Sequence, residues 1–370
     1  MKFSSPLLHG RRAVTAGVVV AAASLALTAC AGSATPSSSG SGGSGGGSTA
    51  VTLITKTSTN PFFLAMKKGA EDEAAKDGVT LTYAAGAADG DEDGQVKAIE
   101  AAVARGDKGI LITPNGPGVN SAINNARKQG LYVIALDTPP DPADTVDLTI
   151  ATNNFTAGEL IGKWAATKQD GKPANIALLD LHNDKVVSVD YDRDQGFLSG
   201  MGIDVKDPKK NGDEDKSGTY KGGKGGSYTI ACNEPTEGAQ DQGKSAMENC
   251  LSKTKDIDLV YTINEPAAAG AAEALKAAGV TATIVSVDGG CSPGVADVKA
   301  GIIGATSQQY PVKMAQIGVQ AIKAIADGGQ KPAVTPGLDF LDSGVSLVTD
   351  KPVDGIKSIT SDEGSKVCWG

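Results

Sequence analysis

The stretch Tyr261-Thr262-Ile263-Asn264-Glu265-Pro266-Ala267-Ala268-Ala269-Gly270 decides the fold. Its first residues complete an apolar run, 259–263, that predicts a β-strand, and a helix is predicted over 267–278. An amide and a carboxylate, Asn264 and Glu265, stand at the turn between the two. Polar side chains at such a turn are typical of the ligand-binding edge of a parallel α/β sheet.

The same strand-to-helix alternation recurs along the chain. Its first helix is predicted to begin at Asn60-Pro61, with Asn60 as N-cap, and to end at Asp77-Gly78. Alternation of this kind predicts parallel sheets covered by helices, and its restart after residue 151 predicts two similar lobes of about four to six strands each. The other strands are expected at 51–55, 80–84, 109–113, 132–137, 148–151, 175–180, 227–232 and 282–288.

The segment 208–226 interrupts this alternation. It is rich in Lys, Gly and Asp, which predicts an exposed insertion without ligand contacts.

The first thirty residues predict export. Lys2, Arg11 and Arg12 precede a nearly uncharged apolar run, 13–27, that is too short to span a membrane. The run closes with Leu27-Thr28-Ala29-Cys30, which resembles a bacterial lipoprotein signal (1–29) with Cys30 as the lipidated residue. The alternative is an ordinary signal cut near residues 29–31. Residues 30–49 form a Gly/Ser-rich tether, so we expect an extracytoplasmic protein on the outer face of the cell membrane.

Length, charge and hydropathy limit the number of domains and the classes of partner. Removing the first 29 of 370 residues leaves 341, which suggests two domains. The net charge is −9 and no basic run follows the signal, which argues against nucleic acid as a partner. No later apolar segment is long enough to cross a bilayer.

Four cysteines remain in the body of the chain, and an even number in an exported protein predicts two disulfides. Three pairings are possible. We favour Cys232 with Cys250, which joins a strand end to the next helix, and Cys291 with Cys368, which pins the C-terminus. None of the four has a plausible His partner, so a catalytic thiol is not expected.

Polar residues gather at the predicted strand ends. Asn60, Asn115, Asp137, Asn264 and Asp288 all follow or end a strand. Carboxylates and amides facing each other from two lobes suit a neutral sugar, because each hydroxyl both donates and accepts hydrogen bonds. The competing interpretation is structural: these residues can serve as helix caps or turn formers, and the nearby Phe63 can belong to the core.

At these residues the sequence resembles the type I periplasmic sugar-binding proteins of ABC importers, the ribose-binding-like group, over about residues 51–370. Within this group it looks most similar to the fructose-binding proteins. The likeness is carried by Asn60-Pro61-Phe62-Phe63, Ala135-Leu136-Asp137-Thr138-Pro139, Ala151-Thr152-Asn153-Asn154-Phe155, Asp192-Arg193-Asp194-Gln195-Gly196-Phe197, residues 261–270, Val285-Ser286-Val287-Asp288-Gly289-Gly290-Cys291, Ala305-Thr306-Ser307-Gln308-Gln309-Tyr310-Pro311 and Cys368-Trp369-Gly370.

The resemblance implies two Rossmann-like α/β lobes joined by three crossings that close over a monosaccharide. It places 50–152 and about 310–340 in the first lobe, and 153–309 and about 341–370 in the second. It implies a monomer that needs no cofactor or metal and that partners an ABC permease. The implied sugar-binding residues are Asn60, Phe62, Phe63, Asn115, Asp137, Thr138, Asn154, Arg193, Asn264, Asp288 and Gln309.

Differences from the ribose binders bear on which sugar this chain binds. The group often has Asn where this chain has Thr113, and Asn115 is expected to compensate. Ribose binders carry Arg in place of Thr138 and an aromatic residue in place of Val287. These differences argue against ribose and are compatible with a hexose such as D-fructose, which is the expected ligand.

Three alternatives remain beside the transport hypothesis. Residues 89–94 with Glu100 fit a calcium-loop pattern, although the strand before them and the helix expected over 95–105 do not fit an EF-hand. Paired carboxylates could serve a sugar-processing enzyme, but His182 is the one histidine after the signal, and no metal cluster or nucleophile elbow appears. A sensor that hands the loaded protein to a membrane receptor would use the same fold.

Overall fold

A computed structural model describes residues 49–370. The predicted signal, the lipidation site Cys30 and all but the last residue of the tether lie outside the described residues. Within 49–370, none of the helices is long and apolar enough to cross a membrane.

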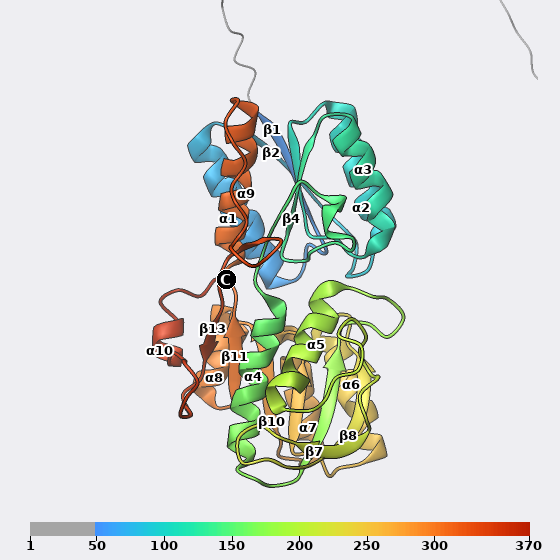
Figure 1. Cartoon of the computed structure of the whole chain (residues 1–370), viewed down its shortest axis with the longest axis vertical. Helices are drawn as coiled ribbons and strands as arrows, with labels where there is room; N and C mark the ends of the chain where they lie inside the picture. The colour runs from blue at the N-terminus through green and yellow to red at the C-terminus, as the bar shows by residue number, and fades with distance from the viewer. Residues whose placement is uncertain (1–48) are drawn as a thin grey trace, which may run out of the picture. The chain divides into compact units, whose positions relative to one another are not determined.

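The first lobe is built on a six-stranded parallel sheet with the strand order β12-β5-β4-β3-β1-β2, in the upper half of Figure 1. Apolar residues of β1 alternate between its two faces: Val51 and Leu53 pack with α1 and α9, whereas Ile54 packs with α2 and α3. The elements of this lobe are β1 (Ala50–Thr55), α1 (Pro61–Asp77), β2 (Thr80–Ala85), α2 (Glu92–Arg105), β3 (Gly109–Ile112), α3 (Asn120–Lys128), β4 (Tyr132–Leu136), β5 (Leu148–Ala151), α9 (Pro311–Ala326), β12 (Leu341–Asp342) and the short turns η1 (Pro117–Val119) and η2 (Ala143–Thr145).

The second lobe has a seven-stranded sheet with the order β13-β11-β10-β9-β6-β8-β7, covered by α4 and α5 on one face and by α6, α7 and α8 on the other. Its elements are α4 (Asn154–Gln169), β6 (Ala174–Asp180), α5 (Ser188–Met201), β7 (Ser217–Tyr220), β8 (Gly226–Pro235), α6 (Gln240–Lys253), β9 (Leu259–Thr262), α7 (Glu265–Ala278), β10 (Thr283–Asp288), η3 (Cys291–Val295), α8 (Ala296–Ala300), β11 (Ala305–Gln308), β13 (Ser346–Val348) and α10 (Ser361–Gly364).

The expected range of four to six strands is wrong for this second sheet. Two antiparallel strands add to it at opposite edges: β7 pairs with β8, and β13 pairs with β11. The segment 208–226, predicted as an exposed insertion, therefore contains a strand. Its Lys-, Gly- and Asp-rich composition gives no strand signal, because the pairing depends on β8 as a partner.

Glycine lets α4 and α5 pack closely. A Cβ atom at Gly158 would lie 2.1 Å from the carbonyl oxygen of Arg193, and one at Gly196 would lie 2.3 Å from the carbonyl oxygen of Phe155. No side chain fits at such distances, so the two helices meet backbone to backbone. This contact fixes the position of Arg193 on the lobe.

The chain passes between the two sheets three times: after β5, after β11 and between β12 and β13. Both favoured disulfides are confirmed, Cys232–Cys250 and Cys291–Cys368. The second bond holds the C-terminus beside these crossings, where the Trp369 Nε1–H donates to the carbonyl oxygen of Gln309. The Trp369 ring also meets Phe62 edge to face, with ring centroids 5.3 Å apart.

Candidate functional site

A small buried cavity lies where the carboxyl ends of both sheets meet. Its wall takes residues from the ends of β1, β2 and β4 in the first lobe and of β6, β9 and β10 in the second. Such edges are where open α/β sheets bind ligands. The lining residues are Lys56, Asn60, Phe62, Phe63, Asp89, Asp137, Leu181, Val189, Arg193, Ile263, Asn264 and Asp288.

The helix cap at Asn60 and its place in the cavity are compatible. Asn60 Oδ1 accepts from the backbone N–H of Phe62, 2.9 Å away, so it caps α1 as the sequence predicts. The same turn brings Phe62 and Phe63 to the cavity, with their rings edge to face and 5.4 Å apart at the centroids. Aromatic rings in this position suit the apolar face of a sugar ring.

Arg193 occupies the centre of the polar wall. Its Nη2 lies 3.7 Å from Asp137 Oδ1 in the first lobe, and its Nη1 lies 3.4 Å from Asp288 Oδ1 in the second. Nε donates to Asn154 Oδ1 at 2.8 Å, and Nη1 also donates to the carbonyl oxygen of Ile263 at 2.9 Å. The guanidinium is thus held in one orientation while it faces carboxylates of both lobes.

Both aspartates beside Arg193 have unusual backbones. Among residues 49–370, four non-glycine residues have positive φ, and two of them are Asp137 (φ 64°) and Asp288 (φ 127°). Strained conformations of this kind concentrate at functional sites, where the surrounding structure enforces them. Glu265 enforces the second, because its carboxylate accepts from the N–H groups of Gly289 and Gly290 at 2.7 and 3.0 Å.

Burial and charge shift the carboxyl pKa values in different directions. Burial raises the pKa of Asp288 to about 7, with Arg193 opposing the shift and Asp137 adding to it. Burial, followed by the charge of Asp288, raises the pKa of Glu265 to about 8. Burial also acts to raise the pKa of Asp89, but Lys56 and His182 outweigh it and hold this pKa below its usual range.

Four predicted residues do not line the cavity. All four contact residues that do: Thr138 Oγ1 donates to Asp137 Oδ2, Asn154 accepts from Arg193, Gln309 Nε2 donates to Asp288 Oδ1 at 3.0 Å, and Asn115 Nδ2 donates to the carbonyl oxygen of Lys56 at 3.4 Å. Asn115 is itself fully buried. Its amide holds the loop after β2, accepting from Gly90 N–H at 3.0 Å and donating to the carbonyl oxygen of Asp91 at 3.1 Å.

The acidic loop after β2 is not arranged as a calcium site. Asp89 turns into the cavity, Asp91 accepts from Ala87 N–H and Gly94 N–H as the cap of α2, and Glu92 accepts from Gly118 N–H. Glu100 is exposed on α2, whose observed start at Glu92 places part of the loop inside the helix. These side chains point to different partners, so the loop pattern has no convergent set of ligands.

Comparison with known proteins agrees with this architecture. Residues 51–331 match the periplasmic binding protein domain family. This chain belongs to that family. The ribose import binding protein of Salmonella typhimurium is 26% identical over 287 residues, which cover 77% of this chain and 88% of the relative. The D-allose-binding periplasmic protein of Escherichia coli is 26% identical over 293 residues, 77% of this chain and 86% of that protein.

Solved structures show the same fold. A solute-binding protein of an ABC transporter from Agrobacterium vitis, with bound D-fucose, superposes with a TM-score of 0.70 at 23% identity, covering 86% of this chain and 100% of that one. The myo-inositol-binding protein of Caulobacter gives a TM-score of 0.68 at 21% identity, covering 82% and 94%. The ribose relative is an import binding protein, and the Agrobacterium vitis structure is a solute-binding protein of an ABC transporter.

Sequence reasoning missed five cavity residues: Lys56, Asp89, Leu181, Val189 and Ile263. A usable signal existed for the first two, because Lys56 directly follows β1 and Asp89 lies shortly after β2. For Asp89, the calcium-loop pattern offers a competing interpretation of the same residue. The argument from Val287 also needs correction, since Val287 is fully buried in the core under α4 and α5 and does not face the cavity.

Proposed function

We propose that this binding protein captures a neutral monosaccharide between its lobes and delivers it to an ABC permease. One observation carries the proposal. Three buried oxygens in or beside the cavity, Asp89 Oδ1, Asp137 Oδ1 and Gln309 Oε1, make no hydrogen bond, and the basic groups that face the two aspartates stay 3.7 Å or more away. Buried acceptors without donors are costly, and sugar hydroxyl groups would supply the donors.

The charges of the wall favour an uncharged ligand. Two cationic side chains, Lys56 and Arg193, face three carboxylates, Asp89, Asp137 and Asp288. A sugar phosphate or sugar acid would add negative charge to a wall whose two cations already face carboxyl groups. A neutral sugar can instead donate to the carboxylates and accept from the cations, which leaves every charge hydrogen-bonded.

Binding requires the lobes to open. The cavity has a volume of about 30 Å³, enough for one or two water molecules but not for a sugar ring. A sugar would therefore enter an open form, separate Arg193 from at least one of its carboxylates, and take over those contacts as the lobes close. Because it touches both lobes only in the closed form, the sugar shifts the population toward that form.

The ligand that we propose is D-fructose, in line with the resemblance to fructose-binding proteins. The relatives named above bind ribose, D-allose, D-fucose and myo-inositol, so the class is monosaccharides and related polyols. Thr138 supports a difference from ribose binders, because it gives Asp137 a neutral hydroxyl partner where they carry Arg. The proposed anchor at Cys30 would keep the protein beside its permease at the outer face of the membrane.

A thermal-unfolding screen tests the proposal with fructose, ribose, glucose, galactose, xylose and inositol. Ligand at 100 times its dissociation constant adds about 2.7 kcal/mol to stability, and we expect the largest shift with fructose. Asp137→Asn should abolish the shift, whereas Asp204→Asn should keep it, because Asp204 is exposed and pairs with Lys221.

The possible outcomes separate three errors. No shift with any sugar would refute the function. A full shift in Asp137→Asn would refute the site alone. A largest shift with another sugar would refute fructose but leave the rest intact.

A further inference from the structure

The sugar cavity contains a second charged pair besides the group around Arg193. Lys56, which directly follows β1, and Asp89, in the loop after β2, both line the cavity from the first lobe. His182, in the loop after β6 of the second lobe, faces Asp89. None of these three residues is among those that the family resemblance assigns to the sugar.

These three side chains are buried, yet they make no direct hydrogen bond with one another. The exposed fraction is 2% for Lys56 and 7% for His182. Lys56 Nζ lies 4.0 Å and His182 Nε2 3.7 Å from Asp89 Oδ1, and within 49–370 neither Oδ1 nor Nε2 has a hydrogen-bond partner. One oxygen atom about 2.8 Å from both Lys56 Nζ and Asp89 Oδ1 would bridge them at this separation.

The charges of the Lys56–Asp89 pair restrict what this bridging atom can be. Burial acts to raise the pKa of Asp89, but Lys56 and His182 hold it below its usual range, so Asp89 is an ionised carboxylate that only accepts. A lysine ammonium only donates. A bridging group must therefore accept from one and donate to the other. A hydroxyl group does both, whereas an ether oxygen, a carbonyl oxygen or a fluorine atom cannot donate.

The first lobe fixes the spacing of the pair. The fully buried Asn115 accepts from Gly90 N–H at 3.0 Å and donates to the carbonyl oxygen of Asp91 at 3.1 Å and to that of Lys56 at 3.4 Å. One amide thus ties the residue after β1 to the loop that carries Asp89. Because the two charged groups belong to one braced unit, a ligand that binds them orders few additional torsions.

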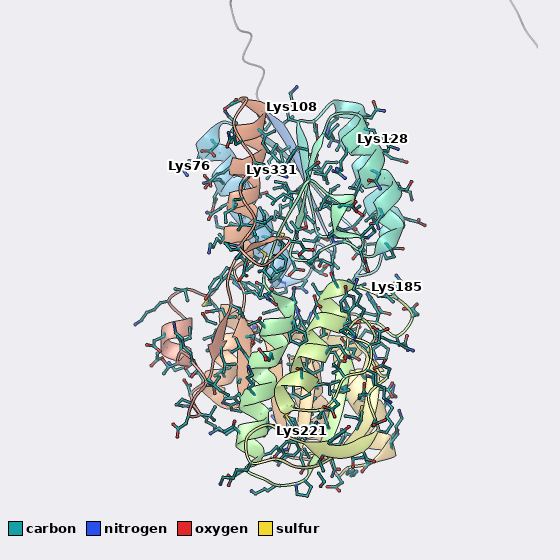
Figure 2. The ribbon with its side chains drawn as sticks, in the orientation of Figure 1. Lys76, Lys108, Lys128, Lys185, Lys221 and Lys331 are labelled. Carbon is teal, nitrogen blue, oxygen red and sulfur yellow. A yellow bond between two sulfur atoms is a disulfide. The ribbon has the colours of Figure 1, made fainter. Side chains whose placement is uncertain are left out.

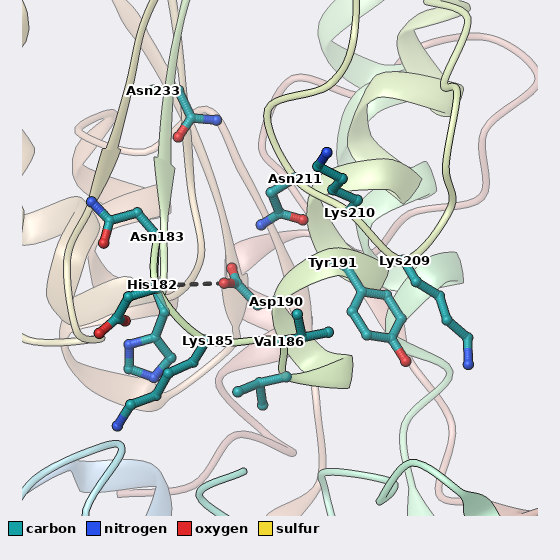
Figure 3. A pocket seen from close by; sticks show the side chains of 12 residues that line it. His182, Asn183, Lys185, Val186, Asp190, Tyr191, Lys209, Lys210, Asn211 and Asn233 are labelled. Carbon is teal, nitrogen blue, oxygen red and sulfur yellow. Dashed lines mark hydrogen bonds between the residues drawn. The ribbon is translucent and has the colours of Figure 1, made fainter. Parts of the chain in front are cut away.

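The second lobe makes close contact with the same loop. Gly90 has φ 84°, and a Cβ atom there would lie 2.5 Å from Lys185 Nζ and 3.4 Å from His182 Cε1. Lys185 Nζ also donates to the Gly90 carbonyl oxygen at 2.7 Å. Figure 3 shows His182 and Lys185 together on the loop after β6. Closure of the lobes therefore brings the imidazole to a pair that the first lobe already holds.

We propose that Lys56 and Asp89 determine specificity by binding one hydroxyl group of the sugar, and that His182 is a positioning residue that orients Asp89 Oδ1 toward it in the closed form. The inference rests on the proposed function and adds the chemistry of the ligand at one carbon atom. The hydroxyl accepts from Lys56 Nζ and donates to Asp89 Oδ1. A sugar with hydrogen, fluorine or methoxy at that carbon loses one or both of these bonds.

The test combines changes in the sugar with changes in the protein. Titration calorimetry on the full-length protein uses the sugar with the largest shift in the thermal screen, for which we expect D-fructose, and its monodeoxy and monofluoro derivatives. At one carbon, both derivatives should bind the wild type at least about tenfold more weakly than the parent sugar. Lys56→Met/Asp89→Leu should nearly abolish that penalty while penalties at other carbons persist, which is the coupling that a double-mutant cycle measures.

This double variant suits the test because apolar residues of similar volume can replace a buried ion pair without loss of stability. Lys68→Met/Asp72→Leu is the matched control, since it removes an exposed pair on α1 and should keep every wild-type affinity. The unfolding temperature of each variant without sugar checks that it is folded.

His182→Phe tests the positioning role and carries the experiment if the double variant does not fold. It keeps a planar ring and the backbone N–H that donates to Asp190, but it removes Nε2. Affinity for the parent sugar should fall roughly threefold or more, and the penalty should shrink only at the same carbon. A merely structural role would weaken all derivatives by the same factor.

The outcomes separate this inference from the proposed function. Normal sugar binding with equal penalties in the wild type and in the variants at every carbon would overturn the inference and leave the function intact. A fluoro derivative that binds as tightly as the parent sugar at the coupled carbon would also overturn it, because fluorine cannot donate to Asp89. Absence of any sugar binding by the wild type would overturn the function and this inference with it.

Discussion

Arg193 of the second lobe and Asp137 of the first face each other across the cavity, with Nη2 3.7 Å from Oδ1. The same guanidinium lies 3.4 Å from Asp288 Oδ1 of its own lobe. One side chain therefore connects the charges of the two lobes, and its orientation is fixed by Asn154 and by the carbonyl oxygen of Ile263. The planar guanidinium presents its N–H donors in a fixed fork toward both acceptors, whereas a lysine is a flexible point charge without this geometry.

The first prediction concerns this fork. Arg193→Lys keeps the positive charge but loses the rigid fork that faces both carboxylates, so sugar affinity should fall roughly thirtyfold or more, equivalent to about 2 kcal/mol for a truncated buried charge pair. Titration calorimetry with the sugar from the screen measures this. Arg127→Lys is the matched control, since Arg127 pairs with Asp147 within the first lobe. Unchanged affinity in Arg193→Lys would show that the fork does not contact the ligand.

A second contact between the lobes involves Lys185. Its Nζ donates to the carbonyl oxygen of Gly90 at 2.7 Å, beside the pair in which His182 Nε2 lies 3.7 Å from Asp89 Oδ1. Figure 2 places Lys185 at the junction of the lobes and Lys221 at the far end of the second lobe. The loop that carries Asp89 is thus held against the second lobe only when the lobes are closed.

Lys185→Met should therefore favour the open form. Loss of one such hydrogen bond costs about 1 kcal/mol, which predicts a roughly fivefold weaker sugar affinity. Small-angle scattering without sugar should also show a larger radius of gyration. Lys221→Met, which breaks an exposed pair within one lobe, should change neither quantity. If the two variants behave alike, Lys185 has no part in closure.

Local chemistry explains what the sequence predicted well. The helix from Asn60-Pro61 to Gly78 is as predicted. Its N-cap, its first-turn proline and its left-handed glycine are local signals that can be recognised in the sequence of the helix and its two flanking residues. The strand β7 was missed because Ser217–Tyr220 becomes a strand only through its partner β8.

The cavity residues also differ in whether neighbouring residues or distant contacts determine their positions. Asp137 and Asp288 could be predicted from their places at strand ends, since position along a parallel sheet fixes where a side chain emerges. For Asp89 the sequence shows only a place shortly after β2, because the inward orientation of its side chain depends on Lys56 and His182, which are distant in sequence and belong to different lobes.

The third prediction distinguishes the effects of the two disulfides on stability and on sugar affinity. Chain-entropy estimates give ceilings of about 3 kcal/mol for Cys232–Cys250 and about 4.5 kcal/mol for Cys291–Cys368. Only the second should affect sugar binding, because Cys291 follows the Asp288 turn and Cys368 precedes Trp369, which packs on Phe62. Cys291→Ser/Cys368→Ser should lower both stability and affinity. Cys232→Ser/Cys250→Ser should lower stability alone, and an equal loss of affinity in both pairs would contradict this account.

The last prediction concerns pH. Burial first, and neighbouring carboxylates next, raise the pKa of Asp180, of Asp194 and, to about 8, of Glu265. A carboxyl with a raised folded-state pKa holds a proton that the unfolded chain has already released, so its contribution makes stability fall as pH rises between the two pKa values. In EDTA and without sugar, the free energy of unfolding should therefore decrease from pH 5 to pH 8, by at least about 1.4 kcal/mol, the equivalent of one pKa unit.

Denaturant titrations at several pH values check this expectation. Carboxyls with lowered pKa values, such as Glu73 and Asp91, titrate below this range and do not oppose the trend. Glu265→Gln removes a carboxyl whose pKa is raised to about 8, so the stability of the variant should vary less between pH 7 and pH 8 than that of the wild type. Asp241→Asn, at an exposed site on α6, is the matched control and should reproduce the wild-type slope. A stability that rises with pH in wild-type protein would mean that these carboxylates are already compensated in the folded chain.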